Sequence, residues 1–243
     1  MARMYNLMIC KVIANGRCGR KGENDMAYEF VPESEYKAYR SDCAAVLKDA
    51  CARLYEKGIV AQFILIGSGG RGLVTRNGNG PFDLDYNLNI IKADADYWND
   101  LRKMKETIRV ALNRAEKFDC FSDAQDSTSC LTAILHFADT PKVEFSFDVA
   151  IVTKNKNGND MRLIHNKNYD IFMSADQYTW NEVPNSCKVR KKALELKKKG
   201  VWQEVRNRYL ELKNMYLYRQ DNDHPSFVVY VEAVNEIYGK HFR

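Results

Sequence analysis

Eight consecutive residues in the first half of the chain, Asp83–Ile90, alternate strictly between polar and apolar side chains. A period of two residues is that of a β-strand, because successive side chains of a strand point to opposite faces. The apolar set (Leu84, Tyr86, Leu88 and Ile90) can therefore enter a core while the other face stays open. Asp83 and Asp85 are two residues apart, so both carboxylates lie on that open face.

A second segment supplies a third carboxylate. Val143–Val152 is rich in β-branched and aromatic residues, and Asp148 projects away from its apolar face. The run Leu131–Phe137 precedes it at a spacing that predicts a β-hairpin. If the strands of Asp83 and Asp148 are neighbours, three carboxylates converge, and their repulsion favours a bound cation. Hard oxygen ligands favour Mg²⁺ or Mn²⁺, and two such ions can serve a phosphoryl transfer.

A glycine-rich segment precedes the carboxylate pair. Ile59–Ile66 is an apolar run broken only by Gln62, which predicts a buried strand. The run stops at Gly67–Ser68, and six glycines between Gly67 and Phe82 predict a long loop that can include a short helical turn. Exposed backbone N–H groups and a hydroxyl at such a turn are groups that can hold phosphate oxygens.

The rest of the pattern predicts an α+β fold followed by helices. Apolar residues recur at helical spacing after Ser34 and again over residues 101–118, a short strand is expected at Met161–Ile164, and the pattern is helical from about Ser186. We expect an N-terminal segment (1–33), a core of mixed sheet with flanking helices (34–165), and a helical C-terminal region (166–243) that forms the other wall of a cleft.

Positive charge is concentrated towards the end of the chain. Residues 186–219 contain eleven Lys or Arg and three Glu, whereas the whole chain has a net charge of +5. This asymmetry favours a polyanionic ligand such as a nucleotide or RNA. A solvated lysine face explains the same composition equally well.

The cysteine and hydropathy patterns exclude other classes. Seven cysteines without a Cys-x-x-Cys pair favour reduced thiols over a disulfide framework, and no histidine has zinc-ligand spacing to a cysteine. The apolar runs are shorter than the ~20 residues of a membrane span. Met1–Ala14 is interrupted by Asn6 and Lys11, which is atypical of a secretory signal. We therefore expect a cytoplasmic protein without a membrane partner.

The order of these motifs resembles a known signature. An apolar strand, Gly-Ser, a loop, Asp-apolar-Asp-apolar and a later apolar-Asp-apolar is similar to the DNA polymerase beta-like nucleotidyltransferase superfamily. The Gly67-Ser68-x-x-x-Gly72 form is similar to oligoadenylate synthetases and bacterial cyclic-oligonucleotide synthases, and also to minimal and antibiotic-modifying nucleotidyltransferases. The resemblance covers residues 34–153.

The resemblance implies a site and an activity. Asp83 and Asp85 would hold two Mg²⁺ or Mn²⁺ ions, Asp148 would serve the catalytic ion and help to activate a hydroxyl, and Gly67 and Ser68 would contact the triphosphate. The implied enzyme binds ATP or another NTP and transfers its nucleoside monophosphate to a hydroxyl, releasing pyrophosphate. A nucleotide or RNA is the favoured acceptor, and the product could be a signalling oligonucleotide. The alternatives are a non-catalytic nucleotide- or RNA-binding module and an antibiotic- or protein-modifying transferase.

Several other residues are candidates for supporting roles. Glu144 shares the strand face of Asp148 and is a second candidate for the third ligand. The basic candidates for triphosphate binding are Lys188, Lys191, Lys192 and Lys197, and the aromatic candidates for base stacking are Tyr169, Tyr178 and Trp180. Core packing is the favoured explanation for at least two of these aromatic residues. The sequence does not determine the base preference or the oligomeric state.

Overall fold

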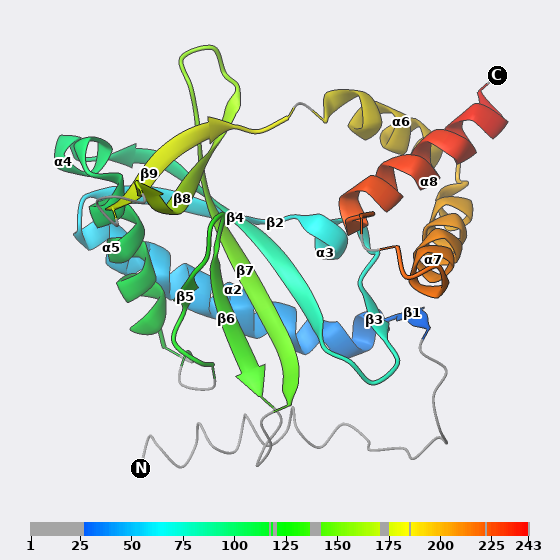
Figure 1. Ribbon diagram of the computed structural model, residues 1–243, viewed down its shortest axis with the longest axis horizontal. Helices are drawn as coiled ribbons and strands as arrows, with labels where there is room; N and C mark the ends of the chain where they lie inside the picture. The colour runs from blue at the N-terminus through cyan, green and yellow to red at the C-terminus, as the bar shows by residue number, and fades with distance from the viewer. Residues whose placement is uncertain are drawn as a thin grey trace.

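The computed structural model describes residues 27–116, 118, 121–136, 142–170, 175–184, 186–221 and 223–242. Figure 1 shows a curved sheet with long helices beside it and a separate group of helices at the C-terminal end of the chain. Most of the expected N-terminal segment (residues 1–26) and most of the link expected between the two hairpin strands lie outside the described residues. None of the helices in the described part of the chain is both long and apolar enough to cross a membrane.

The alternating segment forms β4 (Phe82–Ala93), the second strand of a mixed sheet. It pairs antiparallel with the edge strand β2 (Ile59–Leu65) and parallel with β7 (Val143–Lys154). Beyond β7 the order continues through β6 (Leu131–His136) and β5 (Gln125–Asp126). The antiparallel pairing of β6 with β7 confirms the predicted hairpin, and the parallel pairing brings the strands of Asp83 and Asp148 together.

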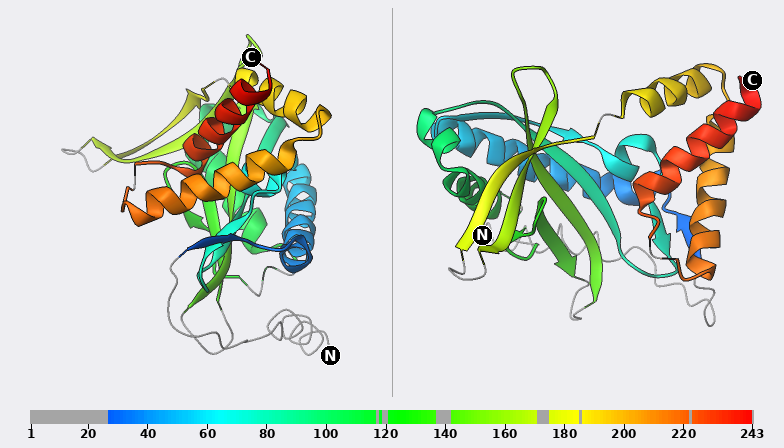
Figure 2. Two further views of the ribbon diagram at one scale, coloured as in Figure 1. Left: turned by 90° about the vertical axis from the view of Figure 1, so that its right-hand side faces the viewer. Right: turned by 45° about the horizontal axis from the view of Figure 1, so that its top comes forward.

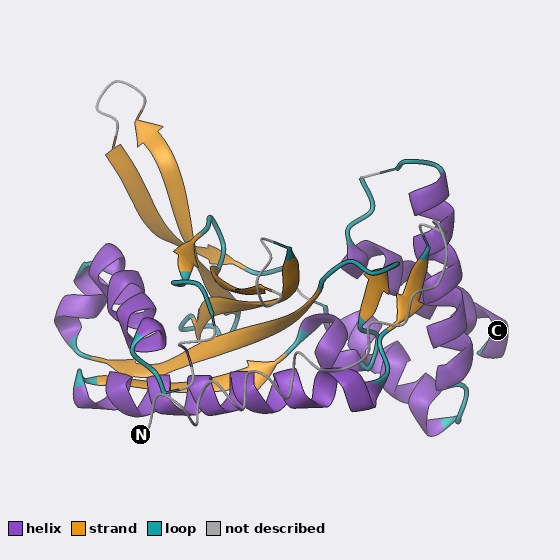
Figure 3. Cartoon of the chain, turned by 90° about the horizontal axis from the view of Figure 1, so that it is seen from below, coloured by secondary structure: helices purple, strands orange, loops and turns teal. Residues whose placement is uncertain are grey.

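One face of this sheet is buried by helices. Figure 3 shows α2 (Glu33–Glu56) lying along the sheet, and α5 (Leu101–Asn113) packs against α2, next to the short helix α4 (Ala95–Asn99). The core between these layers contains the four apolar residues of the alternating pattern, each 4% exposed or less: Leu84, Tyr86, Leu88 and Ile90. The polar residues of β4 are thereby left on the opposite face.

The sheet extends further than the sequence pattern indicates. The short strand expected at Met161–Ile164 is the beginning of β8 (Asp160–Asp170), which pairs with β7 and with β9 (Ala175–Glu182). The boundary expected after residue 165 falls inside β8. Many residues of β8 and β9 are polar, so the two strands lack the apolar alternation that identified β4.

The C-terminal helices have a core of their own. This second core is formed by α6 (Cys187–Lys198), α7 (Trp202–Tyr218) and α8 (Ser226–His241), and Leu73 of the glycine-rich segment is buried in it. The guanidinium of Arg206 donates to the carbonyl of Gly72 and lies over the ring of Phe30. Phe30 belongs to β1 (Tyr28–Phe30), which pairs with β3 (Thr75–Asn77) beside α7 (Figure 2). The helices are thus attached to the segment that follows β2.

Candidate active site

The three aspartates lie on the open face of two adjacent strands. In the parallel register of β4 and β7, Asp85 is the partner of Asp148, and Asp83 is the partner of Ser146. Their chain neighbours, such as Leu84 and Phe147, point into the core, so the aspartates of both strands project from the other side. The adjacency predicted from the sequence is therefore present.

The electrostatics of the site reflect this crowding. Partial burial, together with the charges of Asp83 and Asp148, raises the pKa of Asp85 to about 6. Asp83 is solvent-accessible, yet desolvation by the surrounding protein and the charge of Asp148 also raise the pKa of its carboxyl. Arg71 and Arg162 act against the shift at Asp85, and neither cation cancels it. The site therefore holds more negative charge than its neighbours neutralise.

The Gly-Ser turn lies directly against Asp85. It opens α3 (Gly67–Arg71), and the preceding Ile66 donates its N–H to the carbonyl of Asp85 at 2.8 Å. Gly67 has a φ of +58°, and a Cβ placed on it would come within 1.9 Å of Asp85 Oδ2. Only glycine fits this contact and this backbone conformation. The segment expected as a loop thus contains the short helix α3 and the strand β3.

A lysine that the sequence analysis missed approaches the site from the helical region. Burial lowers the pKa of the Lys213 ammonium on α7, and the nearby charge of Asp83 acts in the opposite direction without cancelling this effect. Its Nζ lies 3.2 Å from Thr75 Oγ1 and 3.3 Å from Ser226 Oγ, and 3.8 Å from the centre of the Tyr28 ring. Lys213 follows Tyr209 by one helical turn on the buried side of α7, and a lysine at that spacing is the signal that could have identified it.

The lysines proposed from the sequence occupy other positions. Lys188 and Lys191 are exposed on α6, and Lys192 donates to Asn235 of α8 at 2.7 Å. Lys197 lies over the Trp202 ring at 4.4 Å and lines a cavity described below.

The other candidates are engaged in packing. Glu144 is buried and accepts a hydrogen bond from the Tyr39 hydroxyl. Tyr178 and Trp180 belong to β9: the Tyr178 ring stacks on His165 at 4.2 Å, and Trp180 contacts Trp98. The side chain of Tyr169 lies outside the described residues.

A cavity of about 890 Å³ adjoins the Gly-Ser turn. Its sides come from the sheet, from α3, and from the helices α6 and α8, and they include Gly67, Arg71, Asn87, Asn89, Arg190, Lys197, Phe227 and Tyr230. Asn87 and Asn89 continue the open face of β4 beyond Asp85. The three aspartates are not among the residues that line the cavity, which therefore begins beside them instead of over them.

The donor set fits a hard divalent cation, because it consists of carboxylate oxygens whose own repulsion such a charge would relieve. Within the described residues, however, no three His, Cys, Asp or Glu side chains are grouped tightly enough to form a complete cation cage. Mg²⁺ is commonly held by one or two carboxylates together with substrate phosphates. The aspartates are thus suited to supply part of a coordination shell.

The architecture defines a class of fold. The strand order and the flanking helices form a mixed-sheet α/β fold with a helical C-terminal region, and this fold is similar to that of the solved structure of E. coli MS115-1 CdnC. No family model and no curated protein sequence matches the chain.

Three solved structures illustrate the likeness. E. coli MS115-1 CdnC with ATP has a TM-score of 0.50 and 14% identity, over 86% of this chain and 62% of that one. The Bradyrhizobium diazoefficiens CD-NTase CdnG in complex with GTP has a TM-score of 0.46 and 18% identity, over 67% and 42%. Escherichia coli DncV in its 3'-deoxy GTP bound form has a TM-score of 0.48 and 12% identity, over 100% and 59%. The chain spans about half the length of these proteins, and the likeness to CdnC confirms the predicted fold.

Proposed function

We propose that this chain is a nucleotidyltransferase, which transfers a nucleoside monophosphate from an NTP to a hydroxyl acceptor and releases pyrophosphate. The observation that carries the proposal is the pairing of Asp85 with Asp148 across β4 and β7, with Asp83 on the same face and Gly67 against Asp85. The fold shared with CdnC, whose structure contains ATP, supports a nucleoside triphosphate as the substrate.

Each part of the site has a role in this proposal. Asp83, Asp85 and Asp148 would hold Mg²⁺ or Mn²⁺, which neutralises charge on the triphosphate and in the transition state. The N–H groups and the Ser68 hydroxyl at the start of α3 would bind phosphate oxygens. Lys213 adds a positive charge near Asp83, where it would contact the same phosphates.

The chemistry then needs little from the protein beyond positioning and charge stabilisation. The oxygen of the acceptor hydroxyl attacks the α-phosphorus, and the bond from that phosphorus to the oxygen bridging the β-phosphate breaks. Asp148 would accept the proton of the hydroxyl. Pyrophosphate leaves with the electron pair of the broken bond.

The cavity next to Gly67 is the proposed place for a nucleoside. Its volume of about 890 Å³ lies within the usual range of ligand sites. The half-exposed ring of Phe227 could stack on a base, and the amides of Asn87 and Asn89 could bind base edges. Arg190 and Lys197 make this cavity cationic. These features favour a nucleotide or RNA as the acceptor.

The decisive experiment is incubation of the purified protein with each labelled NTP and Mg²⁺ or Mn²⁺, with and without RNA, followed by mass spectrometry. The expected result is a linear or cyclic oligonucleotide, or extended RNA, together with pyrophosphate. The Asp83→Asn variant should form no product, whereas Asp96→Asn, which alters an exposed acid on α4, should match the wild type. Binding of NTP without product in every mixture, equal in wild type and Asp83→Asn, would identify a binding module instead.

A further inference from the structure

Thr132 of β6 flanks Asp148 on the side away from Asp85. In the antiparallel register of β6 and β7, Thr132 is the direct partner of Asp148, and its chain neighbours Leu131 and Ala133 are buried in the core. Its Oγ1 lies 2.5 Å from Asp148 Oδ1. Asp85, Asp148 and Thr132 therefore form a row across three adjacent strands, with the hydroxyl at one end.

The direction of each hydrogen bond in this row follows from its chemistry. An ionised carboxylate only accepts hydrogen bonds, so the Thr132 hydroxyl donates to Asp148. The hydroxyl has a single hydrogen, so in its 3.6 Å contact with Cys130 Sγ the Thr132 oxygen serves as the acceptor and not as the donor. The Thr132 hydroxyl thus gives its own hydrogen to the Asp148 carboxylate.

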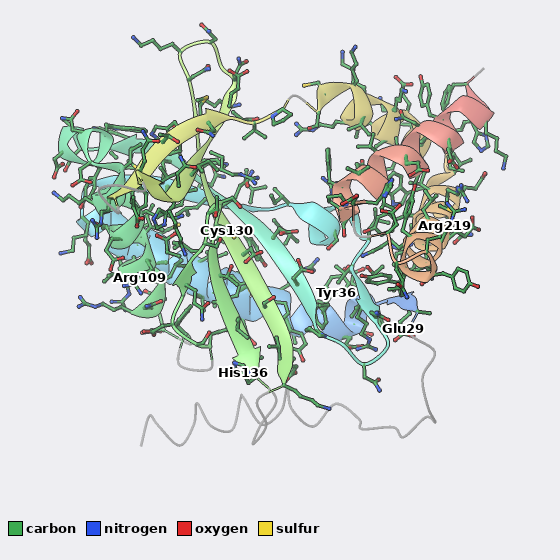
Figure 4. All side chains as sticks on the ribbon, viewed as in Figure 1. Glu29, Tyr36, Arg109, Cys130, His136 and Arg219 are labelled. Carbon is green, nitrogen blue, oxygen red and sulfur yellow. The ribbon has the colours of Figure 1, made fainter. Side chains whose placement is uncertain are left out.

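The turn that leads into β6 is held firmly. Ser127 Oγ lies 3.0 Å from the carbonyl oxygen and from the Sγ of Cys130. The carbonyl of Ser127 accepts a hydrogen bond from Lys105 at 2.8 Å, and Lys105 is only 2% exposed and pairs with Asp126 at 2.6 Å. Figure 4 labels Cys130 at the beginning of β6 and His136 at the other end of the strand. Thr132 is therefore placed by fixed neighbours.

We propose that Thr132 is a positioning residue for Asp148, and this inference rests on the proposed transferase function. The terminal torsion of an aspartate has a broad distribution of angles. A hydrogen bond to Oδ1 fixes that torsion and leaves Oδ2 for the side of Asp85, where a cation or an acceptor hydroxyl would be bound. Loss of such an outer hydrogen bond to a metal ligand typically lowers metal affinity or activity by about 10- to 100-fold.

The test compares Thr132→Val, which keeps the shape and removes the hydroxyl, with Thr132→Ser, which keeps the hydroxyl. Mn²⁺ affinity is measured by EPR titration without nucleotide. We expect Thr132→Val to bind Mn²⁺ about 10- to 100-fold more weakly, and Thr132→Ser to recover most of the affinity. With NTP, kcat should fall in Thr132→Val while the KM for NTP changes little. Thr179→Val on β9, where the hydroxyl contacts Asn181 at 2.9 Å, is the matched control and should behave as wild type.

The outcomes separate this inference from the function on which it rests. Wild-type turnover and Mn²⁺ binding that are both unchanged in Thr132→Val would overturn the role of Thr132 and leave the transferase proposal intact. A wild-type protein with neither Mn²⁺ binding nor turnover would overturn both. Should Thr132→Val fail to fold, as judged by circular dichroism, Thr132→Ala is measured in its place, and the same loss with rescue by Thr132→Ser is expected.

Discussion

Replacing Asp85 by Asn should stabilise the metal-free protein and inactivate it at the same time. Burial disfavours the ionised form of Asp85 most, and the charges of Asp83 on its own strand and Asp148 on the next strand add to this effect. An asparagine side chain has nearly the same volume as that of aspartate and carries no charge. The free energy of unfolding should therefore rise where wild-type Asp85 is ionised, although the proposed catalytic site has lost a ligand.

The size of the effect follows from the pKa. Asp85 shifts from an ordinary value of 3.8 to about 6 in the folded chain. At 1.36 kcal/mol per pKa unit, its ionisation costs the folded state about 3 kcal/mol at pH 8. Because the folded pKa is the higher one, stability is lost as the pH rises from about 4 to about 6, and the full loss persists above that range. At pH 5 about half of the cost remains.

The assay is thermal unfolding in EDTA between pH 5 and pH 8. For a chain of 243 residues, a gain of about 3 kcal/mol corresponds to a rise in Tm of roughly 5–10 °C at pH 8, and about half of that at pH 5. Mg²⁺ or Mn²⁺ should raise the Tm of the wild type and have little effect on Asp85→Asn. Turnover of the variant should fall by at least ~10³-fold, which corresponds to about 4 kcal/mol of transition-state stabilisation.

One result would refute this reasoning. If Asp85→Asn lowers the Tm in EDTA at pH 8, and turnover falls only in proportion to the folded fraction, Asp85 is a structural residue. Asp96→Asn, which removes an exposed carboxylate that pairs with Lys103, should by contrast leave the Tm unchanged or lower it slightly.

Three further substitutions test the remaining parts of the site. Gly67→Ala should lose Mn²⁺ binding and about 1–2 kcal/mol of stability or more, because residue 67 has a positive φ and an added Cβ would collide with Asp85. Gly200 also has a positive φ, but nothing lies within 4 Å of an added Cβ. Thermal unfolding of Gly200→Ala should therefore show the cost of the backbone strain without a collision. Ser68→Ala should raise the NTP dissociation constant about tenfold by calorimetry with an unchanged Tm, since one hydrogen bond to a charged group contributes about 1.5 kcal/mol. Lys213→Met should raise the KM for NTP at least ~10-fold and maintain or raise the Tm, because burial opposes the charged ammonium; a lower Tm with an unchanged KM would indicate a packing role.

The three aspartates could be predicted because the sequence of each strand distinguishes the residues of its buried face from those of its open face. Along β4 each polar residue is flanked by residues that are almost fully buried, and the same holds for Asp148 between Phe147 and Val149. Such alternation identifies a strand and the open face of its side chains without knowledge of the partner strand. The register is different, because the partnership of Asp85 with Asp148 depends on a parallel pairing between segments about sixty residues apart.

What the sequence could not provide depends on contacts between distant elements. Lys213 differs from the other lysines of the basic stretch only in facing β1, β3 and Asp83, and local composition does not record that contact. The same applies to Thr132, whose role follows from its register with Asp148. The strands β8 and β9 pair through many polar residues, so the apolar alternation of the sequence predicted a sheet that ends too early in the chain.

The fold can contain an electrostatically unfavourable site because the strands that carry the aspartates bury apolar side chains on the other face of the sheet. On the helix-covered side, Leu84, Tyr86, Phe147 and Val149 are each at most 2% exposed, and at about 1.5–3 kcal/mol per buried side chain they outweigh the cost of ionising Asp85. A strand that shifted by one residue to separate the aspartates would also turn this apolar set out of the core. The core therefore fixes the position of the carboxylates, and the stored repulsion is available to be relieved by a cation.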